Sequence, residues 1–120
     1  MKKLFLSLIT LATLATGAIA QGPSYPYLVS RGVPSSYSVT ATSGTALAAN
    51  NLRRGVIIVN DGATKCYISL NSGAAAVAGQ GIMLAANGGA YTSDFTQLYR
   101  GAITAITASS TTTLDITEYQ

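Results

Sequence analysis

The side chains of this 120-residue chain that could carry acid–base or nucleophilic chemistry are few: four carboxylates and one thiol, with no histidine. Without histidine, neither a Ser-His-Asp nor a Cys-His nucleophile can be built, and the commonest metal ligand is missing. A single cysteine also excludes a structural zinc site made of several thiolates within one chain. The sequence therefore predicts a protein that is not an enzyme and has no catalytic, cofactor-binding or metal-ligating residues.

The spacing of these few groups does not favour chemistry either. Asp115 and Glu118 are three residues apart in an expected strand, so their side chains should project to opposite faces rather than face each other as a glycosidase pair does. Asp61 lies in a turn, where an aspartate commonly bonds its own backbone. Cys66 begins the alternating segment 66–70, so we expect it to be buried as a small apolar residue rather than exposed as a reactive thiol.

The basic residues suggest contacts between subunits rather than nucleic-acid binding. The formal charge is +3, and two of the seven basic residues are lysines within residues 1–20. Arg53 and Arg54, together with Lys65 and Arg100, could form a basic patch, but the near balance of charge does not favour nucleic acid, which requires a concentrated positive face. We expect Arg53 and Arg54 to pair with the carboxylates or carbonyls of a neighbouring subunit.

Apolar residues recur with a period of two from residue 37 onward, which predicts an all-β protein without a convincing helix. Expected strands cover 37–42, 56–59, 65–71, 82–85, 90–92, 102–108 and 112–119. The β-branched run 56–59 is typical of a strand covered on both faces, and the turn 60–64 should pair it with 65–71 as a central hairpin. We therefore expect a single antiparallel β-sandwich or jelly-roll-like domain of seven to eight short strands over residues 37–120.

The N-terminus has the organisation of a secretory signal peptide. Residues 1–20 place two lysines before an apolar run and small residues before Gln21, so cleavage after Ala20 and export are expected. The alternative is a retained membrane anchor, in which case the chain would contact a membrane.

Residues 21–36 hold all three prolines and read as an extended arm, either unpaired or lying along a sheet edge. Aromatic and apolar residues are dense there, so the arm is expected either to dock on a neighbouring subunit or to be a loose terminus. The docking residues would be Tyr25, Tyr27, Leu28 and Val29. Only 9% of all residues are charged and 48% are hydrophobic, so a homo-oligomer is expected.

An ordered series of features follows the arm. An arginine precedes an apolar strand ending in Asn over 54–60, the strand 66–71 comes next, Leu84 precedes a Gly turn, Tyr99 begins an alternating stretch over 99–108, and Thr117-Glu118 lies in the last strand. From Arg53 to Gln120 this order resembles small β-rich structural proteins of tailed bacteriophages, of the head-decoration or accessory virion kind. The resemblance implies a virion structural protein whose partners are other virion subunits.

The leader departs from this resemblance, because virion proteins assemble in the cytoplasm. The expected localisation is therefore the virion or, alternatively, an exported periplasmic, secreted or surface location. The alternative function is a secreted or surface-attached module that binds a carbohydrate or another surface ligand. Its stacking rings would be Tyr91, Tyr99 and Tyr119, although tyrosines in sheets commonly pack against neighbours instead.

Overall fold

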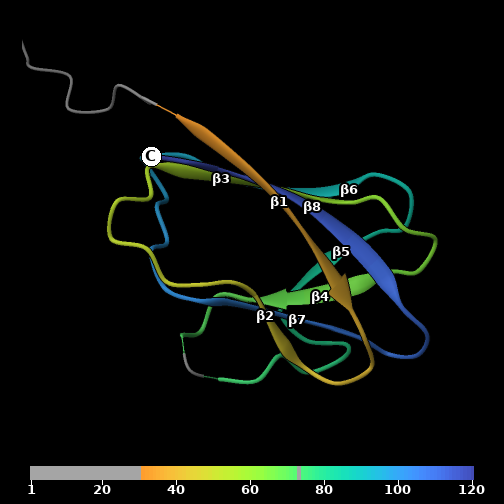
Figure 1. Ribbon diagram of the computed structural model, residues 1–120. Coiled ribbons are helices and arrows are strands. Elements are labelled where there is room, and N and C mark those ends of the chain that lie inside the picture. Colours follow the sequence, from red (N-terminus) through yellow and green to blue (C-terminus); the bar gives the residue numbers. More distant parts are fainter. Residues whose placement is uncertain (1–30, 73) are drawn as a thin grey trace, which may run out of the picture.

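The protein forms two four-stranded antiparallel sheets, which confirms the expected all-β class. The computed structural model describes residues 31–72 and 74–120, and these contain eight strands and no helix (Figure 1). The strands are β1 (Gly32–Val39), β2 (Gly44–Leu47), β3 (Gly55–Asn60), β4 (Cys66–Ser69), β5 (Ile82–Leu84), β6 (Gly89–Ser93), β7 (Ile103–Thr107) and β8 (Thr112–Tyr119). One sheet, here the β1 sheet, has the order β1-β8-β3-β6, and the β2 sheet has the order β2-β7-β4-β5.

The strand pairs are nested like the two arms of one long hairpin. β1 pairs with β8, β2 with β7, β3 with β6, and β4 with β5, all antiparallel. Further ladders between β3 and β8 and between β4 and β7 complete the two sheets. Only β4 and β5 are consecutive strands of one sheet, so every other connection crosses from one sheet to the other.

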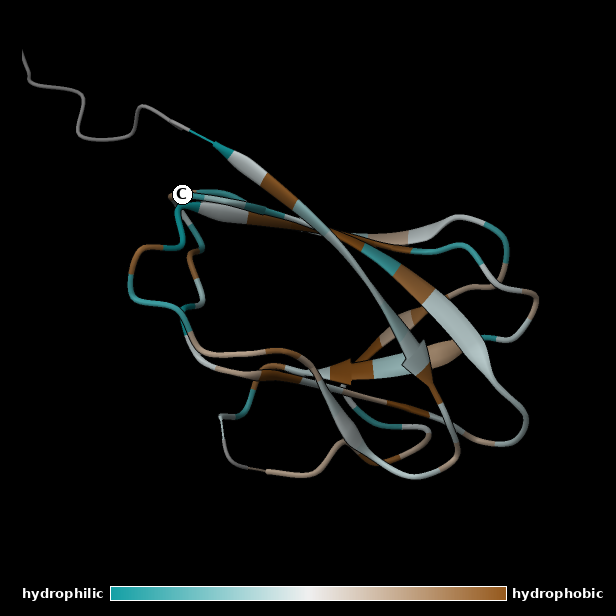
Figure 2. Ribbon diagram, viewed as in Figure 1, coloured by the Kyte–Doolittle hydropathy of each residue, from teal (hydrophilic) through white to brown (hydrophobic). Residues whose placement is uncertain are grey.

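One hydrophobic core lies between the sheets. It consists of Val39, Val56, Ile58, Cys66, Ile68, Leu84, Ile103, Ala105, Leu114 and Ile116. Successive side chains of a strand point to opposite faces, so inward apolar residues alternate with outward polar ones, as the banding along β8 shows (Figure 2). Burying these side chains is the main favourable contribution to folding.

The expected central hairpin is wrong. β3 belongs to the β1 sheet and β4 to the β2 sheet, so the connection between them passes from one sheet to the other instead of reversing within one sheet. The buried Asn60 side chain holds this crossing: its Nδ2 donates to the carbonyl of Thr64 at 2.9 Å, and its Oδ1 accepts from the amide of Gly62 at 3.2 Å. The same amide group reaches Ala85 and Thr112, which ties the crossing to β5 and β8. Asn60 therefore stabilises a connection between two sheets, whereas the sequence predicts a hairpin turn within one sheet.

Two further expectations need correction. β3 is buried only on its inner face, because Ile57 and Val59 point outward and are half-buried. Residues 32–36 lie along a sheet edge, which is one of the two expected alternatives for the arm, but they do so as the first part of β1. The arm therefore ends before Gly32, which pairs with Tyr119, and Arg31 already exchanges backbone hydrogen bonds with Gln120. The sequence pattern extends the arm to residue 36 because Pro34 interrupts the alternation of a strand. Pro34 fits because β1 is an edge strand, where a missing amide donor is tolerated.

Candidate assembly surface

The residues expected to mediate assembly fall into two groups. Tyr25, Tyr27, Leu28 and Val29 lie outside the described residues, as does the leader with its expected cleavage after Ala20. Arg53 and Arg54 are described and stand immediately before β3. The backbone amide of Arg54 donates to the carbonyl of Tyr119 at 2.7 Å, so this segment is fixed to the end of β8.

Arg53 bonds within its own chain, contrary to the expectation that it pairs with a neighbouring subunit. Its fully buried guanidinium donates from Nε to Glu118 Oε1 at 2.6 Å. Nη1 donates to the carbonyls of Tyr99 and Gly101, each at 2.9 Å, and Nη2 donates to the carbonyl of Ala48 at 2.6 Å. The partner groups are a carboxylate and carbonyls, as expected, but they belong to this chain. Arg53 therefore ties three segments of one domain together and is not accessible to a partner.

Glu118 is the partner that sequence reasoning missed. The two residues are far apart in the sequence, and no local pattern joins them. The other carboxylate oxygen, Oε2, accepts from Asn50 Nδ2 at 3.1 Å and from Gln120 Nε2 at 3.2 Å. Burial raises the pKa of the Glu118 carboxyl. The hydrogen bonds from Arg53, Asn50 and Gln120 and the charge of Arg53 together lower it by more than burial raises it, so the pKa lies below its ordinary value.

The lowered pKa of Glu118 predicts a loss of stability in acid. Folding favours the carboxylate, so this contribution is present at neutral pH and is lost as the pH falls below about 4.5, the ordinary pKa, towards the lowered value. Urea unfolding at pH 7 and pH 3 should show a large fall in unfolding free energy for the natural chain and a smaller fall for Glu118→Gln. Asp94, whose pKa is lowered by hydrogen bonds from Thr96, accounts for part of the remaining slope. Equal falls in the two proteins would contradict the prediction.

The outer face of the β1 sheet is formed by the outward side chains of β6, β3, β8 and β1. Directly paired residues point to the same face, so Ile57 and Val59 continue across the sheet as two rows. One row is Thr92, Ile57, Thr117 and Pro34, and the other is Ala90, Val59, Asp115 and Ser36. Asp115 is the single charged side chain in these rows. The expected opposition of the two carboxylates is confirmed, since Asp115 is exposed on this face and Glu118 is buried on the other.

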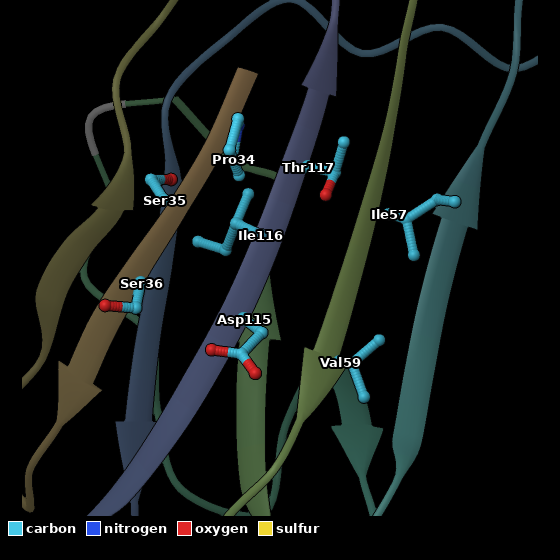
Figure 3. Close-up of a pocket in the computed structure, with 8 residues that line it drawn as sticks. All are labelled: Pro34, Ser35, Ser36, Ile57, Val59, Asp115, Ile116 and Thr117. Atoms are coloured by element: carbon cyan, nitrogen blue, oxygen red, sulfur yellow. The ribbon is translucent and has the colours of Figure 1, made fainter. Parts of the chain in front are cut away.

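A shallow hollow of about 370 Å³ lies on this outer face, across β1, β8 and β3 (Figure 3). It is lined by Pro34, Ser35, Ser36, Ile57, Val59, Asp115, Ile116 and Thr117. A smaller hollow of about 180 Å³ begins at Ile57 and extends to Tyr119 and the exposed ring of Phe95. Ile57 lines both hollows, so they are neighbours on this face, and together they are here called the outer groove. Apolar side chains and hydroxyl groups line it, together with the charged residues Arg54, Asp94 and Asp115.

The outer face of the β2 sheet is partly covered by the protein's own loop between β4 and β5. Thr104 Oγ1 donates to the carbonyl of Ala74 at 3.1 Å, and the amide of the buried Ala76 donates to Ser43 Oγ at 2.7 Å. The remaining outward apolar residues of that sheet include Tyr67, Met83 and Ile106, which lie in one row. The β1 sheet thus carries the outer groove, whereas the β2 sheet is partly covered by this loop and keeps one apolar row.

The Cys66 thiol and the tyrosines are the groups that a reactive cysteine or a carbohydrate-binding site would use. Cys66 is buried as expected, and burial raises its pKa to about 11, so the reactive thiolate is disfavoured. The three tyrosines proposed as stacking rings are half-buried; Tyr91 and Tyr99 pack against the core, whereas Tyr119 lines the outer groove. Neither Tyr91 nor Tyr99 is presented as a free ring.

Over residues 31–72 and 74–120 there is no helix of the length and apolarity that a membrane crossing requires. Comparison of the chain with protein-family models, with curated proteins and with solved structures finds no match. A function must therefore be inferred from the strand connectivity and the surfaces described above.

Proposed function

We propose that this chain is a non-enzymatic structural protein of a virion, in which a β-sandwich of jelly-roll connectivity joins a larger shell as a decoration, minor capsid or tail accessory subunit. The nested pairing of β1 with β8, β2 with β7, β3 with β6 and β4 with β5 supports it most strongly. A long hairpin rolled up in this way is the plan of jelly rolls, which occur in viral capsid proteins and lectins. This support is an analogy of fold, and the phage-like order of features over 53–120 adds to it.

The outer groove provides a second line of support. Interface centres are depleted of charged residues and enriched in aromatic ones. The larger hollow contains one charged side chain, Asp115, and the smaller one adds the rings of Tyr119 and Phe95 together with Arg54 and Asp94. A surface of this kind favours contact with other subunits, both further copies of this chain and different virion proteins. Export to the periplasm, the medium or the cell surface after cleavage at Ala20 is the alternative localisation.

The alternative function is a secreted or surface-attached module that binds a carbohydrate. It is favoured by the same connectivity, because lectins also use jelly rolls, and by Phe95 and Tyr119, whose rings could stack on a sugar. A glycan array separates the two functions. Specific binding that is lost in Phe95→Ala and retained in Tyr91→Phe would favour the carbohydrate module, whereas an array without binding would favour the structural protein.

The proposed assembly predicts that the arm matters for association and not for folding. Because Arg31 and Gly32 already pair with β8, the deletion should end at Ser30. Removing residues 21–30 takes away no strand of the two sheets, so the thermal midpoint of the monomer should be nearly unchanged. Association should weaken at least tenfold, which corresponds to about 1.4 kcal/mol.

Sedimentation velocity over a range of concentrations measures this association. The matched control extends the deletion to residues 21–33, which removes Gly32 and Val33 from the start of β1 and should lower the thermal midpoint. If the chain without 21–30 associates as tightly as the complete chain, the arm is a loose terminus, and the sheet faces alone must make the contacts.

A further inference from the structure

We infer that the outer groove of the β1 sheet receives the Tyr25–Val29 segment of a second copy of this chain. The inference rests on the proposed assembly function and adds to it the surface on which the arm docks. The occupant is a named segment of the chain that precedes the described residues, and the site is formed by β1, β8, β3 and the start of the loop after β6.

The walls of the outer groove match the chemistry of this segment. Pro34, Ile57 and Val59 present apolar surface on which tyrosine rings and aliphatic side chains can pack. Asp115, which is exposed on the same face, offers a carboxylate that can accept a hydrogen bond from a tyrosine hydroxyl. The groove thus combines apolar contact area with a polar partner for the tip of a tyrosine.

Charge also favours this occupant. Residues 21–30 contain no charged side chain, whereas the outer groove has Asp115 in its larger hollow and Arg54 and Asp94 in its smaller one. Packing the segment in the larger hollow therefore removes one charged side chain from water, and the desolvation penalty that weakens charged interfaces stays small there. Pro26 lies within the segment, and because the ring of a proline fixes its φ, the segment loses less conformational freedom on binding than one without proline would.

The length of the chain indicates that a second copy supplies the segment. Arg31 is held opposite Gln120 at the end of the β1 sheet, and Asp115 pairs with Ser36, five residues further along β1. At ~3.3 Å per residue this places the Asp115 end of the larger hollow roughly 16 Å from Arg31. Consecutive Cα atoms are ~3.8 Å apart, so within one chain the Cα atom of Val29 lies within about 8 Å of that of Arg31 and that of Leu28 within about 11 Å, whereas Tyr25 can lie as far as about 23 Å away. The tyrosines of a chain can therefore approach its own Asp115 but Leu28 and Val29 cannot, so the whole Tyr25–Val29 segment can lie along the larger hollow only when a second copy supplies it.

A lysine at the centre of the outer groove should block docking. Ile57 lines both hollows, points outward and is half-buried on β3, so Ile57→Lys places a cation in the docking site. The matched control is Ile106→Lys, which changes the same residue type at a half-buried outward position of β7 in the other sheet. Each variant is expressed with all 120 residues, so that the segment before Arg31 is present. We expect Ile57→Lys to weaken association at least tenfold and Ile106→Lys to change it less than twofold.

A crosslinking experiment tests the location independently of that substitution. Position 27 carries p-benzoylphenylalanine in a ¹⁴N chain, which is mixed with a ¹⁵N chain of natural sequence, irradiated and digested with trypsin. We expect the crosslinks to join the ¹⁴N arm to the ¹⁵N peptides 55–65, which holds Ile57 and Val59, and 32–53, which holds Pro34. Crosslinks confined to ¹⁴N peptides would show that the arm lies on its own chain and would overturn the inference.

The remaining outcomes separate this inference from the proposed function. If the chain associates, needs residues 21–30 and has its crosslinks placed by fragment ions at Tyr67 or Met83, then the assembly function stands and the docking surface is wrong. Crosslinks placed at Thr92 or Phe95 of the same peptide, 66–100, would instead agree with the outer groove. If Ile106→Lys weakens association and Ile57→Lys does not, the outer face of the β2 sheet is the contact and the inference fails. If the natural chain stays monomeric at every concentration, both the homo-oligomer and the docking site fail.

Discussion

Replacing Ile58 with aspartate is expected to leave the chain unfolded. Ile58 is fully buried at the centre of β3, where it pairs with Tyr91 on one side and Ile116 on the other. Removing an apolar side chain of this size from a core costs about 2–5 kcal/mol before the charge is considered. Burying an unpaired carboxylate adds several kcal/mol more, and the whole stability of a small domain is only about 5–15 kcal/mol.

Ile57→Asp is the matched control, since it makes the same change one residue earlier on the outward face of β3. Circular dichroism and soluble yield should show a folded chain for Ile57→Asp and an unfolded or insoluble one for Ile58→Asp. If both variants fold equally well, β3 does not lie with Ile58 in the core, and the assignment of faces across the β1 sheet is wrong.

Glu118→Ala is expected to destabilise the domain by about 3–5 kcal/mol, because it leaves the guanidinium of Arg53 buried without its carboxylate. Asn50 and Gln120 would lose an acceptor in the same variant, and the segments that Arg53 joins would be held only by its bonds to carbonyls. Equilibrium unfolding in urea measures the change directly. A loss below about 1 kcal/mol would place this pair among weakly stabilising surface ion pairs and contradict its structural role.

Asp115→Ala provides the control for that experiment. Asp115 lies on the same strand as Glu118, three residues earlier, but points outward and is exposed. An exposed substitution of this kind changes unfolding free energy by about 0.5 kcal/mol or less. The difference between the two alanine variants therefore reports the burial of the Glu118 carboxylate and its bonds, and not the loss of a negative charge as such.

Strand positions could be predicted from the sequence because the pattern of apolar and polar residues within a strand is local to that strand. The segments around Tyr37, Ile68, Ile103 and Leu114 alternate, the segment around Ile58 is a continuous β-branched run, and each lies in a strand. β2 was missed, because its small residues, such as Gly44 and Ala46, resemble those of a loop. The all-β class follows from such local patterns and did not require long-range information.

Sheet membership could not be predicted in the same way. A turn such as 60–64 looks the same in sequence whether the strands beside it pair or separate. The buried amide of Asn60 decides between them, and its partners Ala85 and Thr112 are distant in sequence. The partnership of Arg53 with Glu118 is hidden for the same reason: arginine was identified as a residue that bonds carboxylates and carbonyls, but which chain supplies them depends on the fold.

The outer groove is likewise a property of the assembled sheet. The run 56–59 is apolar at every position, which suggested cover on both faces within one chain. The fold covers only Val56 and Ile58 and leaves Ile57 and Val59 half-buried. Two outward apolar side chains on one strand, in a chain with so few charges, favour a contact of this face with another subunit.

Quantitative mass spectrometry of purified virus particles tests the proposed function most directly. Particles from a culture that produces this chain are separated by density, and the copy number of the peptides 55–65 and 101–120 is measured against a known shell protein. A structural subunit predicts a constant copy number per particle that remains after a salt wash and falls sharply in the Ile57→Lys variant. A chain found in the medium or at the cell surface, and absent from washed particles, would contradict the virion function.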